Sequence, residues 1–311
     1  MADVTNRAFY LKKEQKQLKR DKITLGILVC VVVALCALPP VQTFWKAVCF
    51  QGRFSDWTGQ KLPLEIHVLD VGKADAILIK SDGYAALLDS GHFLAGYQTT
   101  DYLFRHGVES LDYVILSHPD SDHMDGMANV VSEIETGMFL RAELQPEASA
   151  SFSQLDEILR EQNVPQRVLR QGEQFTLGQA EFTVLGPVRE YADTNNSSLV
   201  LRMDCGGFSA LFCGDIEKEA EADLVLSGQD LSVDLLKVAH HGSSTSSTEE
   251  FIRQVAPRCA VVSTGYDRNK LPREEPLACI EAAGARIYRT DTDGDIVFSF
   301  DGECVTITTE K

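Results

Sequence analysis

The chain has 311 residues, 44% of them hydrophobic and 24% charged, which is the composition of a globular protein. This length suits one large domain or two ordinary ones. With a formal net charge of −17, nothing in the composition indicates a general nucleic-acid-binding surface, because tight sequence-independent binding normally needs Lys and Arg to neutralise phosphates. A phosphodiester substrate would therefore need metal ions and a local cationic patch.

The first 61 residues predict a membrane anchor followed by a linker. Residues 1–22 hold seven Lys or Arg (7, 12, 13, 16, 19, 20 and 22) against three acids (3, 14 and 21), and residues 23–38 carry no charge. We predict a basic cytoplasmic tail (1–22), a transmembrane helix (23–41), a linker (42–61) and an outward-facing domain (62–311). A cleaved signal peptide, which would leave the domain secreted, is the alternative.

The eight cysteines contain no CxxC pair, so they predict no structural zinc motif. Six of them, at positions 49, 205, 213, 259, 279 and 304, follow the apolar segment. An exported domain would permit disulfides among these six, and spacing assigns no pairing.

From residue 62 onward the hydrophobic pattern predicts a mixed α/β domain. In the first half we expect strands at 64–70, 76–80, 84–89 and 113–116 and helices at 99–106, 127–135 and 153–162. In the second half we expect strands at 175–177, 181–185, 199–204, 208–213, 235–239, 260–263, 286–289, 295–300 and 304–308, and helices at 217–226, 248–255 and 276–283. Hairpins mixed with helices exclude a doubly wound parallel sheet. Two similar halves favour an αββα sandwich.

The densest polar cluster follows the apolar run 113–116. It comprises His118, Asp120, Asp122, His123 and Asp125. Imidazole and carboxylate together suit zinc, iron or manganese, and loops at strand ends often carry chemistry. A solvated loop in which Asp122 or Asp125 caps a helix is the alternative. Caps explain neither the two histidines nor the alternation of His118, Asp120 and Asp122.

The segment HPDSDH (118–123) resembles the HxHxDH signature of the metallo-β-lactamase fold, with Asp120 where the second His stands. Its setting, LSHPDSDHMDG, is similar to the hydrolase domain of ComEC-type DNA-uptake competence proteins. Four further blocks support this: HVLDVGKADAILI (67–79), LLDSGH (87–92), NNSSL (195–199) and HHGS (240–243). Lys73 and Ala74 replace the Gln and Gly usual in the first of these. The resemblance covers residues 62–311 and implies a four-layer αββα sandwich.

The resemblance also implies two divalent metal ions, zinc or manganese. The implied ligands are His118 and Asp120 for one ion, Asp122, His123 and His240 for the other, and Asp215 as a bridge. If Asp215 is read alone, a helix cap is the alternative. Adjacent histidines on an extended segment point opposite ways, so one can bind metal while the other faces substrate. We assign His240 to metal and His241 to substrate, and the reverse assignment is the alternative. The expected catalytic residues are Asp122, Asp215 and His241.

Several further residues have less specific assignments. Many metallo-β-lactamase relatives carry a His ligand near 195–199, and this chain has none. Asn195, Asn196 and Ser198 are therefore candidates for metal or substrate contacts, although an Asn/Ser turn before a strand explains them equally well. Ser243 is a candidate to donate a hydrogen bond to a phosphate. We expect three further carboxylates to support the site, namely Asp70, Asp75 and Asp89.

The function implied is that of a membrane-anchored extracytoplasmic hydrolase, most simply a phosphodiesterase or nuclease using a hydroxide bridged by two ions. Single-stranded DNA is the first candidate substrate by resemblance. Competence proteins carry a many-helix channel, so we do not expect this chain, with one candidate span, to move DNA across a membrane by itself. The alternatives are a cell-surface phosphodiesterase acting on wall or lipid head groups, a lactam or ester hydrolase, and a metal-poor domain that binds a partner without chemistry.

Overall fold

The computed structural model describes residues 63–143, 150–266, 268 and 270–311. The chain divides into two compact units, residues 1–60 and residues 61–311. The expected tail, transmembrane helix and linker lie outside the described residues. Among the helices that the structure does describe, none is both long and apolar enough to cross a membrane.

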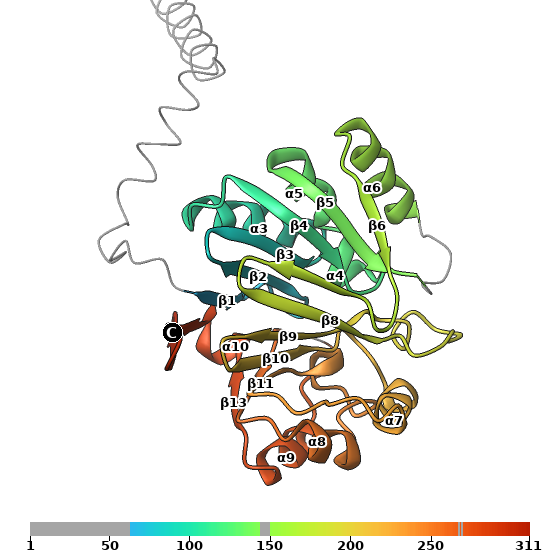
Figure 1. Cartoon of the computed structure of the whole chain (residues 1–311), viewed down its shortest axis with the longest axis vertical. Helices are drawn as coiled ribbons and strands as arrows, with labels where there is room; N and C mark the ends of the chain where they lie inside the picture. The colour runs from blue at the N-terminus through green and yellow to red at the C-terminus, as the bar shows by residue number, and fades with distance from the viewer. Residues whose placement is uncertain (1–62, 144–149, 267, 269) are drawn as a thin grey trace, which may run out of the picture. The chain divides into compact units, whose positions relative to one another are not determined.

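The described part of residues 61–311 contains two β-sheets (Figure 1). The first has the strand order β15 (Val305–Thr309), β14 (Ile296–Phe300), β1 (Leu64–Val68), β2 (Ala76–Ser81), β3 (Tyr84–Ser90), β4 (Ser110–Leu116), β5 (Glu135–Ala142) and β6 (Gln166–Leu169). The second has the order β13 (Arg286–Arg289), β12 (Cys259–Val262), β11 (Leu235–Lys237), β10 (Phe208–Phe212), β9 (Val200–Cys205), β8 (Ala180–Gly186) and β7 (Gln174–Leu177). Both sheets mix parallel and antiparallel pairs, as the predicted hairpins require.

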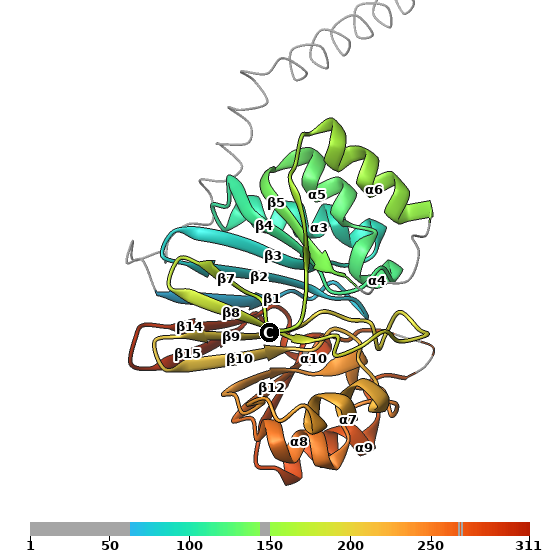
Figure 2. The ribbon, with the colours of Figure 1, turned by 45° about the vertical axis from the view of Figure 1, so that its right-hand side comes forward.

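Helices cover the outer face of each sheet, so the fold has four layers (Figures 1 and 2). The first sheet is covered by α3 (Phe93–Arg105), α4 (Ser121–Met124), α5 (Met127–Glu133) and α6 (Ala150–Glu161). The second is covered by α7 (Lys218–Leu226), α8 (Glu249–Val255) and α9 (Glu274–Ala282). Two short elements, the 3-10 turn η1 (Ala239–Gly242) and α10 (Thr290–Asp293), complete the second half. The predicted αββα sandwich is confirmed.

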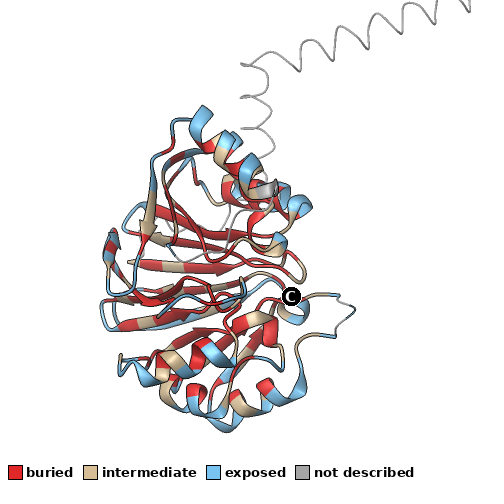
Figure 3. Ribbon diagram, turned by 90° about the vertical axis from the view of Figure 1, so that its right-hand side faces the viewer, coloured by how far each residue is buried: buried red, intermediate tan, exposed pale blue. Residues whose placement is uncertain are grey.

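The alternation of side chains along the strands builds the layers. Ile77 and Ile79 of β2 belong to the apolar cluster between the two sheets, whereas Leu78 belongs to the cluster beneath α3, α5 and α6. Successive side chains of a strand point to opposite faces, so a strand covered on both faces is apolar throughout. A third cluster fills the space between the second sheet and α7–α9. Figure 3 shows the resulting pattern, with buried sheets and helices exposed on their outer faces.

Some element boundaries differ from those expected. The sequence pattern predicted neither β5 nor β6, because their residues mix polar and apolar types without alternation and gain strand structure by parallel pairing with β4 and with each other. Helix α3 begins at Phe93 rather than at 99, because the His92 side chain accepts a hydrogen bond from the Ala95 amide and caps it. The strand expected at 235–239 ends at Lys237, and η1 follows.

Candidate metal centre

The candidate site lies where strands of both sheets end. Asp89 lies near the end of β3, His118 follows β4, Asp215 follows β10, and His240 and His241 follow β11. Strands β3 and β4 run parallel, as do β10 and β11, so their carboxyl ends share an edge. Helix α4 adds Asp122 and His123 at the same edge. Both halves of the chain therefore contribute to one site.

Four side chains form the central group of this site: Asp122, His123, Asp215 and His241. Each offers one ligand atom, and the four atoms lie within 4.8 Å of one another. The Nε2 atom of His123 is 3.3 Å from Asp215 Oδ1. The Nε2 atom of His241 is 3.5 Å from Asp122 Oδ2 and 3.6 Å from Asp215 Oδ2. Two imidazoles and two carboxylates form a donor set that suits zinc or manganese.

Unpartnered buried atoms test whether these residues fit a cation. The Nε2 atoms of His118, His123 and His241, together with Asp215 Oδ1, are buried and have no hydrogen-bond partner within the described part of the chain. Each such atom costs about 1–3 kcal/mol when left unsatisfied. Four of them at one edge of the sandwich would make an uncompensated site expensive. A divalent ion offsets that cost, so the residues fit a metal.

Each of two central imidazoles is oriented by a hydrogen bond at its other nitrogen. His123 Nδ1 is 2.8 Å from Asp89 Oδ2, and His241 Nδ1 donates to the Ser263 carbonyl at 2.9 Å. A proton held at Nδ1 leaves the Nε2 lone pair for a metal. Asp89 is itself fixed by the amide and hydroxyl of Ser117.

The electrostatics of the site favour a cation. Burial lowers the pKa of His123, but Asp215 and Asp89 outweigh burial and hold this pKa well above its usual range. Burial and the neighbouring His123 lower the pKa of His118 to about 4, so His118 is neutral at pH 7. Metals bind neutral imidazole, and a bound ion would replace the proton that His123 otherwise attracts.

A buried ion pair supports the central group from behind. Lys237 Nζ is 2.8 Å from Asp75 Oδ2, and both side chains are buried. Burial raises the pKa of Asp75, but Lys237 and the histidines hold it below its usual value. The Asp75 amide donates to the Asp122 carbonyl, which ties β2 to α4. Asp75, Asp89 and His123 form a second group of potential ligands, but their facing atoms already interact with Lys237, Ser117 and one another. The geometry favours the supporting role that we assigned to Asp75 and Asp89.

The HHGS turn does not have the geometry on which the assignment of its histidines was based. His240 and His241 have φ values of 50° and 52°, so they are left-handed rather than extended, and the premise that they point opposite ways along a strand was wrong. The turn packs tightly, because a Cβ on Gly242 would lie 2.5 Å from Pro272 Cβ. His241 is fully buried in the central group. The geometry thus favours His241 as the ligand.

His240 lies at the mouth of the site. Its side chain is 20% exposed, and its Nδ1 atom is 3.2 Å from Glu217 Oε1 and 3.2 Å from Thr245 Oγ1. Its Nε2 atom is 3.9 Å from Asp215 Oδ2. Ser243 Oγ lies 3.0 Å from Thr245 Oγ1 and so belongs to the same edge. The geometry therefore favours the reverse of the roles that we assigned to the two histidines.

The other expected ion site is more open than the central group. His118 Nε2 lies 3.9 Å from Asp120 Oδ2, and the Asp120 side chain is 40% exposed. His118 is fully buried, and its Nδ1 atom is 3.1 Å from Ser117 Oγ. His118 and Asp120 thus face each other outside the central group of four.

The NNSSL block positions other site residues. Asn196 Oδ1 accepts hydrogen bonds from the amides of Glu217 and Ala220 and so caps α7. Ser198 Oγ accepts from the Asp215 amide at 3.1 Å, and Asn195 Nδ2 donates to Glu217 Oε1. These contacts favour a role in placing Asp215 and Glu217.

Asp70 lies apart from the central group. Its carboxylate forms an ion pair with Lys311 at 2.7 Å, and its amide donates to Asp295 Oδ1. Its neighbours therefore come from the residue before β14 and from the residues after β15. The geometry does not favour the supporting role that we assigned to it.

Sequence reasoning missed four participants. Lys73 Nζ donates to Asp122 Oδ2 at 2.5 Å, Lys237 pairs with Asp75, and Ser117 and Ser263 orient the imidazoles. Lys73 was noted only as a departure from the usual Gln and was given no role, and Lys237 could have been noticed as a charge that ends an apolar strand. Ser263 acts through its main chain, which no sequence pattern reveals.

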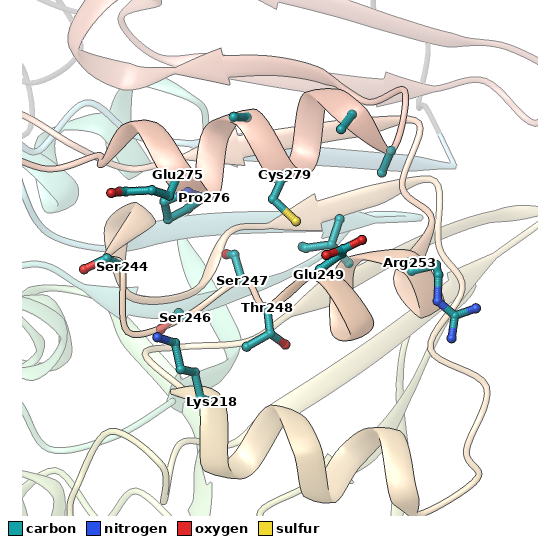
Figure 4. Close-up of a pocket in the computed structure, with 14 residues that line it drawn as sticks. Lys218, Ser244, Ser246, Ser247, Thr248, Glu249, Arg253, Glu275, Pro276 and Cys279 are labelled. Carbon is teal, nitrogen blue, oxygen red and sulfur yellow. The ribbon is translucent and has the colours of Figure 1, made fainter.

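A cavity of about 610 Å³ adjoins the segment that follows the HHGS turn. Figure 4 shows it between Lys218 of α7, the segment 244–249, Arg253 of α8 and Cys279 of α9. The described residues that line it include no member of the central group. The cavity is thus a neighbour of the candidate metal centre and not the centre itself.

Comparison with known proteins agrees with this geometry. A family model described as "Metallo-beta-lactamase superfamily" matches residues 69–266. The chain is 30% identical over 260 residues to ComE operon protein 3 of Bacillus subtilis (strain 168), covering 76% of this chain and 33% of that protein. It is 32% identical over 238 residues to competence protein ComA of Neisseria gonorrhoeae, covering 75% of this chain and 32% of that protein. The chain spans about a third of the length of these relatives.

A solved structure supports the fold alone. The diiron β-hydroxylase CmlA from Streptomyces venezuelae aligns with a TM-score of 0.51 at 13% identity, covering 75% of this chain and 53% of that one.

Proposed function

The chain belongs to the metallo-β-lactamase superfamily, and from that premise we propose that it is a divalent-metal-dependent phosphodiesterase with single-stranded DNA as its first candidate substrate. The observation that carries the proposal is the central group, in which four ligand atoms lie within 4.8 Å and three of its side chains are buried. The resemblance to ComEC-type DNA-uptake proteins, with which the competence-protein relatives agree, supports a nucleic-acid substrate. Only about a third of each of those relatives aligns with this chain, so their complete activities are not assigned to it.

In this proposal Asp122, His123, Asp215 and His241 would hold one ion, and His118 and Asp120, with Asp215, would hold a second. Zinc or manganese bound there would lower the pKa of water and stabilise charge on the phosphate oxygens. The asymmetry of the two sites suggests unequal affinity, because the first has four protein ligands and the second has an exposed Asp120.

In the proposed reaction, side chains of the protein position the attacking water, donate a proton to the leaving oxygen and orient the metal-binding imidazoles. Asp122 and Asp215 would accept hydrogen bonds from the attacking water, and one of these carboxylates would take the proton that the water loses. His240 lies at the mouth, where Glu217 and Thr245 orient its ring, and it gives a proton to the leaving oxygen. Asp89 and the Ser263 carbonyl keep His123 and His241 in the tautomer that leaves Nε2 free.

Charge favours an anionic diester over a neutral lactam. Asp120, Asp122 and Asp215 carry −3 together, two divalent ions carry +4, and Lys73 adds a positive charge beside Asp122. A net positive centre stabilises the negative charge that develops on the transferring oxygens. The remainder of the acidic chain offers little attraction to a polyanion, so this local charge is what supports the assignment.

The test uses the full chain, stripped of metal and reloaded with manganese or zinc. We expect hydrolysis of bis(p-nitrophenyl) phosphate and of single-stranded DNA, and none in chelator. Asp122→Ala and Asp215→Ala should each lower the rate by at least about 100-fold, since even outer partners of metal ligands cost 10–100-fold. Glu161→Ala, an exposed carboxylate on α6, is the matched control and should act like the wild type. Hydrolysis of a chromogenic lactam, with no phosphodiester cleaved by the same preparation, would rule out the proposal.

A further inference from the structure

Two loops meet beside Asp122, and we propose that they bind one nucleotide of a single-stranded polynucleotide, with Lys73 contacting a phosphate and Tyr266 stacking on a base. This inference rests on the proposed function, because it names the polymer that the metal centre would cleave. Lys73 lies on the β1–β2 loop, and Tyr266 lies on the loop that follows β12. Neither residue has a place in the ligand set.

Close packing of the two loops brings these residues together. A Cβ on Gly265 would lie 2.6 Å from Gly72 Cα and 3.0 Å from Lys73 N, so only glycine permits this approach. Tyr266 is the next residue after Gly265, and Lys73 is the next after Gly72. The loop after β12 is also tied to the HHGS turn, because the Arg273 amide donates to the Gly242 carbonyl at 2.8 Å. Both ends of this loop are therefore fixed relative to the central group.

Lys73 is placed to meet a phosphate at the metal centre. Its ammonium group donates to Asp122 Oδ2 at 2.5 Å, and its side chain is 24% exposed. An ion bound to Asp122 would share the charge of that carboxylate and so reduce its hold on Lys73. A phosphate oxygen that reaches the centre then offers Lys73 a new partner. In a chain of net charge −17, such a cation is a specific feature of the mouth.

Tyr266 offers an exposed aromatic ring beside this cation. Its side chain is 100% exposed, and it has no ring or hydrogen-bond partner within the described part of the chain. A single exposed aromatic residue is ordinary on a protein surface. Tyr266 differs because Lys73, on the loop that packs against its own, contacts the candidate metal ligand Asp122. Base–aromatic stacking accepts any base, since every base has a π-face. Tyr266 therefore suits a strand that is bound without sequence preference.

The surroundings extend the same chemistry. The loop after β12 also carries exposed Arg268, Lys270 and Arg273, although Asp267 and the first residues of α9 are acidic. Phe93 and Tyr97 are two further exposed aromatic residues, on α3, with ring centroids 5.9 Å apart. An anionic membrane surface would also attract cations and aromatic rings. Lys73 is mostly buried at the mouth, where a strand reaches more easily than a flat bilayer, so a polynucleotide is favoured.

Binding of a labelled strand tests the proposal directly. The probe is a fluorescein-labelled 20-mer of deoxythymidine with phosphorothioate linkages, titrated with the manganese-loaded full chain and followed by fluorescence anisotropy. We expect Tyr266→Ala to weaken binding about tenfold, within the range of base–aromatic stacking. Lys73→Gln should weaken binding and lower the slope of log affinity against log salt by about 0.7, the value for one phosphate contact to a single strand.

Matched controls separate the surface from general effects. Tyr84→Ala removes a tyrosine that is 51% exposed on the β2–β3 turn, at the end of that hairpin away from the ligands. Lys311→Gln removes a lysine whose ion-pair partner is Asp70. Both should bind the strand as the wild type does. A duplex of the same length should bind more weakly, since its bases are already stacked.

The outcomes also separate this surface from the proposed function. We expect Tyr266→Ala to raise KM for the oligonucleotide. The fold-increase should be about ten times that of KM for bis(p-nitrophenyl) phosphate, which lacks a nucleobase. If diesters are cleaved but both loop variants bind like the wild type, the surface is wrong and the function stands. If no diester is cleaved but both variants weaken binding, the function is wrong and the surface stands. Displacement of the strand by glycerophosphoglycerol, at concentrations where a deoxythymidine tetramer fails to displace it, would assign the surface to lipid head groups and overturn the proposal.

Discussion

His240 and His241 are adjacent in the sequence but have different positions in the site. His241 belongs to the central group of candidate metal ligands, whereas His240 lies at the mouth of the site. His241 is buried and donates from Nδ1 to the Ser263 carbonyl, which directs Nε2 at Asp122 and Asp215. His240 shares the left-handed backbone but contacts Glu217 and Thr245. The acceptor at Nδ1 therefore sets the role of each imidazole.

Metal content of the two histidine variants tests this difference. We expect His241→Ala, in the full chain, to lose about one equivalent of metal by elemental analysis, because packing cannot replace a ligand. His240→Ala should retain the wild-type content and lose activity instead. The two variants are each other's control, since they remove the same group one residue apart. Loss of one equivalent from His240→Ala, with none from His241→Ala, would restore the assignment made from sequence.

For single residues, the sequence predicts which side chains gather at the site but not the contacts that orient those side chains. The alternation of His118, Asp120 and Asp122 is visible in the chain, and the structure places all three at one edge of the sandwich. The conformation of the HHGS turn depends on Gly242 packing against Pro272, which lies 30 positions further on. No short pattern carries that contact, so the roles of the two histidines could not be read from it.

Among the elements, α3 and β1 are joined by a buried polar contact that the sequence did not indicate. His67 Nδ1 lies 2.8 Å from the Tyr102 hydroxyl, and the Tyr102 ring stacks on His106 with centroids 4.1 Å apart. Burial lowers the pKa of His67, and burial together with His67 lowers the pKa of His106 to about 4. Both imidazoles are therefore neutral in the folded protein at pH 7.

This contact predicts a loss of stability in acid. An unfolded His106 takes up a proton near pH 6.5, whereas the folded one does so only near pH 4. Between these values the unfolded chain binds more protons, so stability is fully present above pH 6.5 and falls as the pH falls toward 4. After allowance for solvent screening of a partly exposed group, His106 should contribute about 1 kcal/mol to the loss between pH 7 and pH 5.

Urea unfolding of the full chain in chelator, followed by circular dichroism at both pH values, measures this loss. His106→Gln should show a smaller loss than the wild type by that amount, because it removes the titrating ring. An identical loss in the two proteins would contradict the assignment. The histidines of the metal centre titrate equally in both, so the comparison cancels their effect.

Elements whose stabilising contacts are close in the sequence could be predicted, and elements whose stabilising contacts are distant in the sequence could not. The hairpins β2–β3 and β9–β10 have apolar-rich strands joined by turns at Asp82-Gly83 and Gly206-Gly207, and both appear where they were expected. Strands β5 and β6 depend on parallel neighbours far along the chain, and neither was predicted. The start of α3 depends on one side-chain cap at His92, which is not among the usual capping residues.

For the molecule as a whole, the orientation across a membrane stays a prediction. The basic residues before position 23 and the acidic remainder of the chain favour a cytoplasmic tail and an external domain. Protease added to spheroplasts should digest a tag placed after residue 311 and spare a tag placed before residue 1. Digestion of both tags after lysis is the control. A protected domain in intact spheroplasts would reverse the proposed orientation.

The pairing of β1 with β14 governs the order in which the molecule can assemble. Leu64 lies opposite Phe300 and Val68 opposite Ile296. The first strand of the sandwich, β1, therefore cannot form this pairing until β14 has been synthesised. A ribosome delivers β1 early, and its edge stays without this partner until almost the whole domain has been synthesised. Such distant pairing makes closure slow, because a long loop must be ordered first. A nascent chain of this design stays open until late, which agrees with the prediction that this domain is exported before it folds.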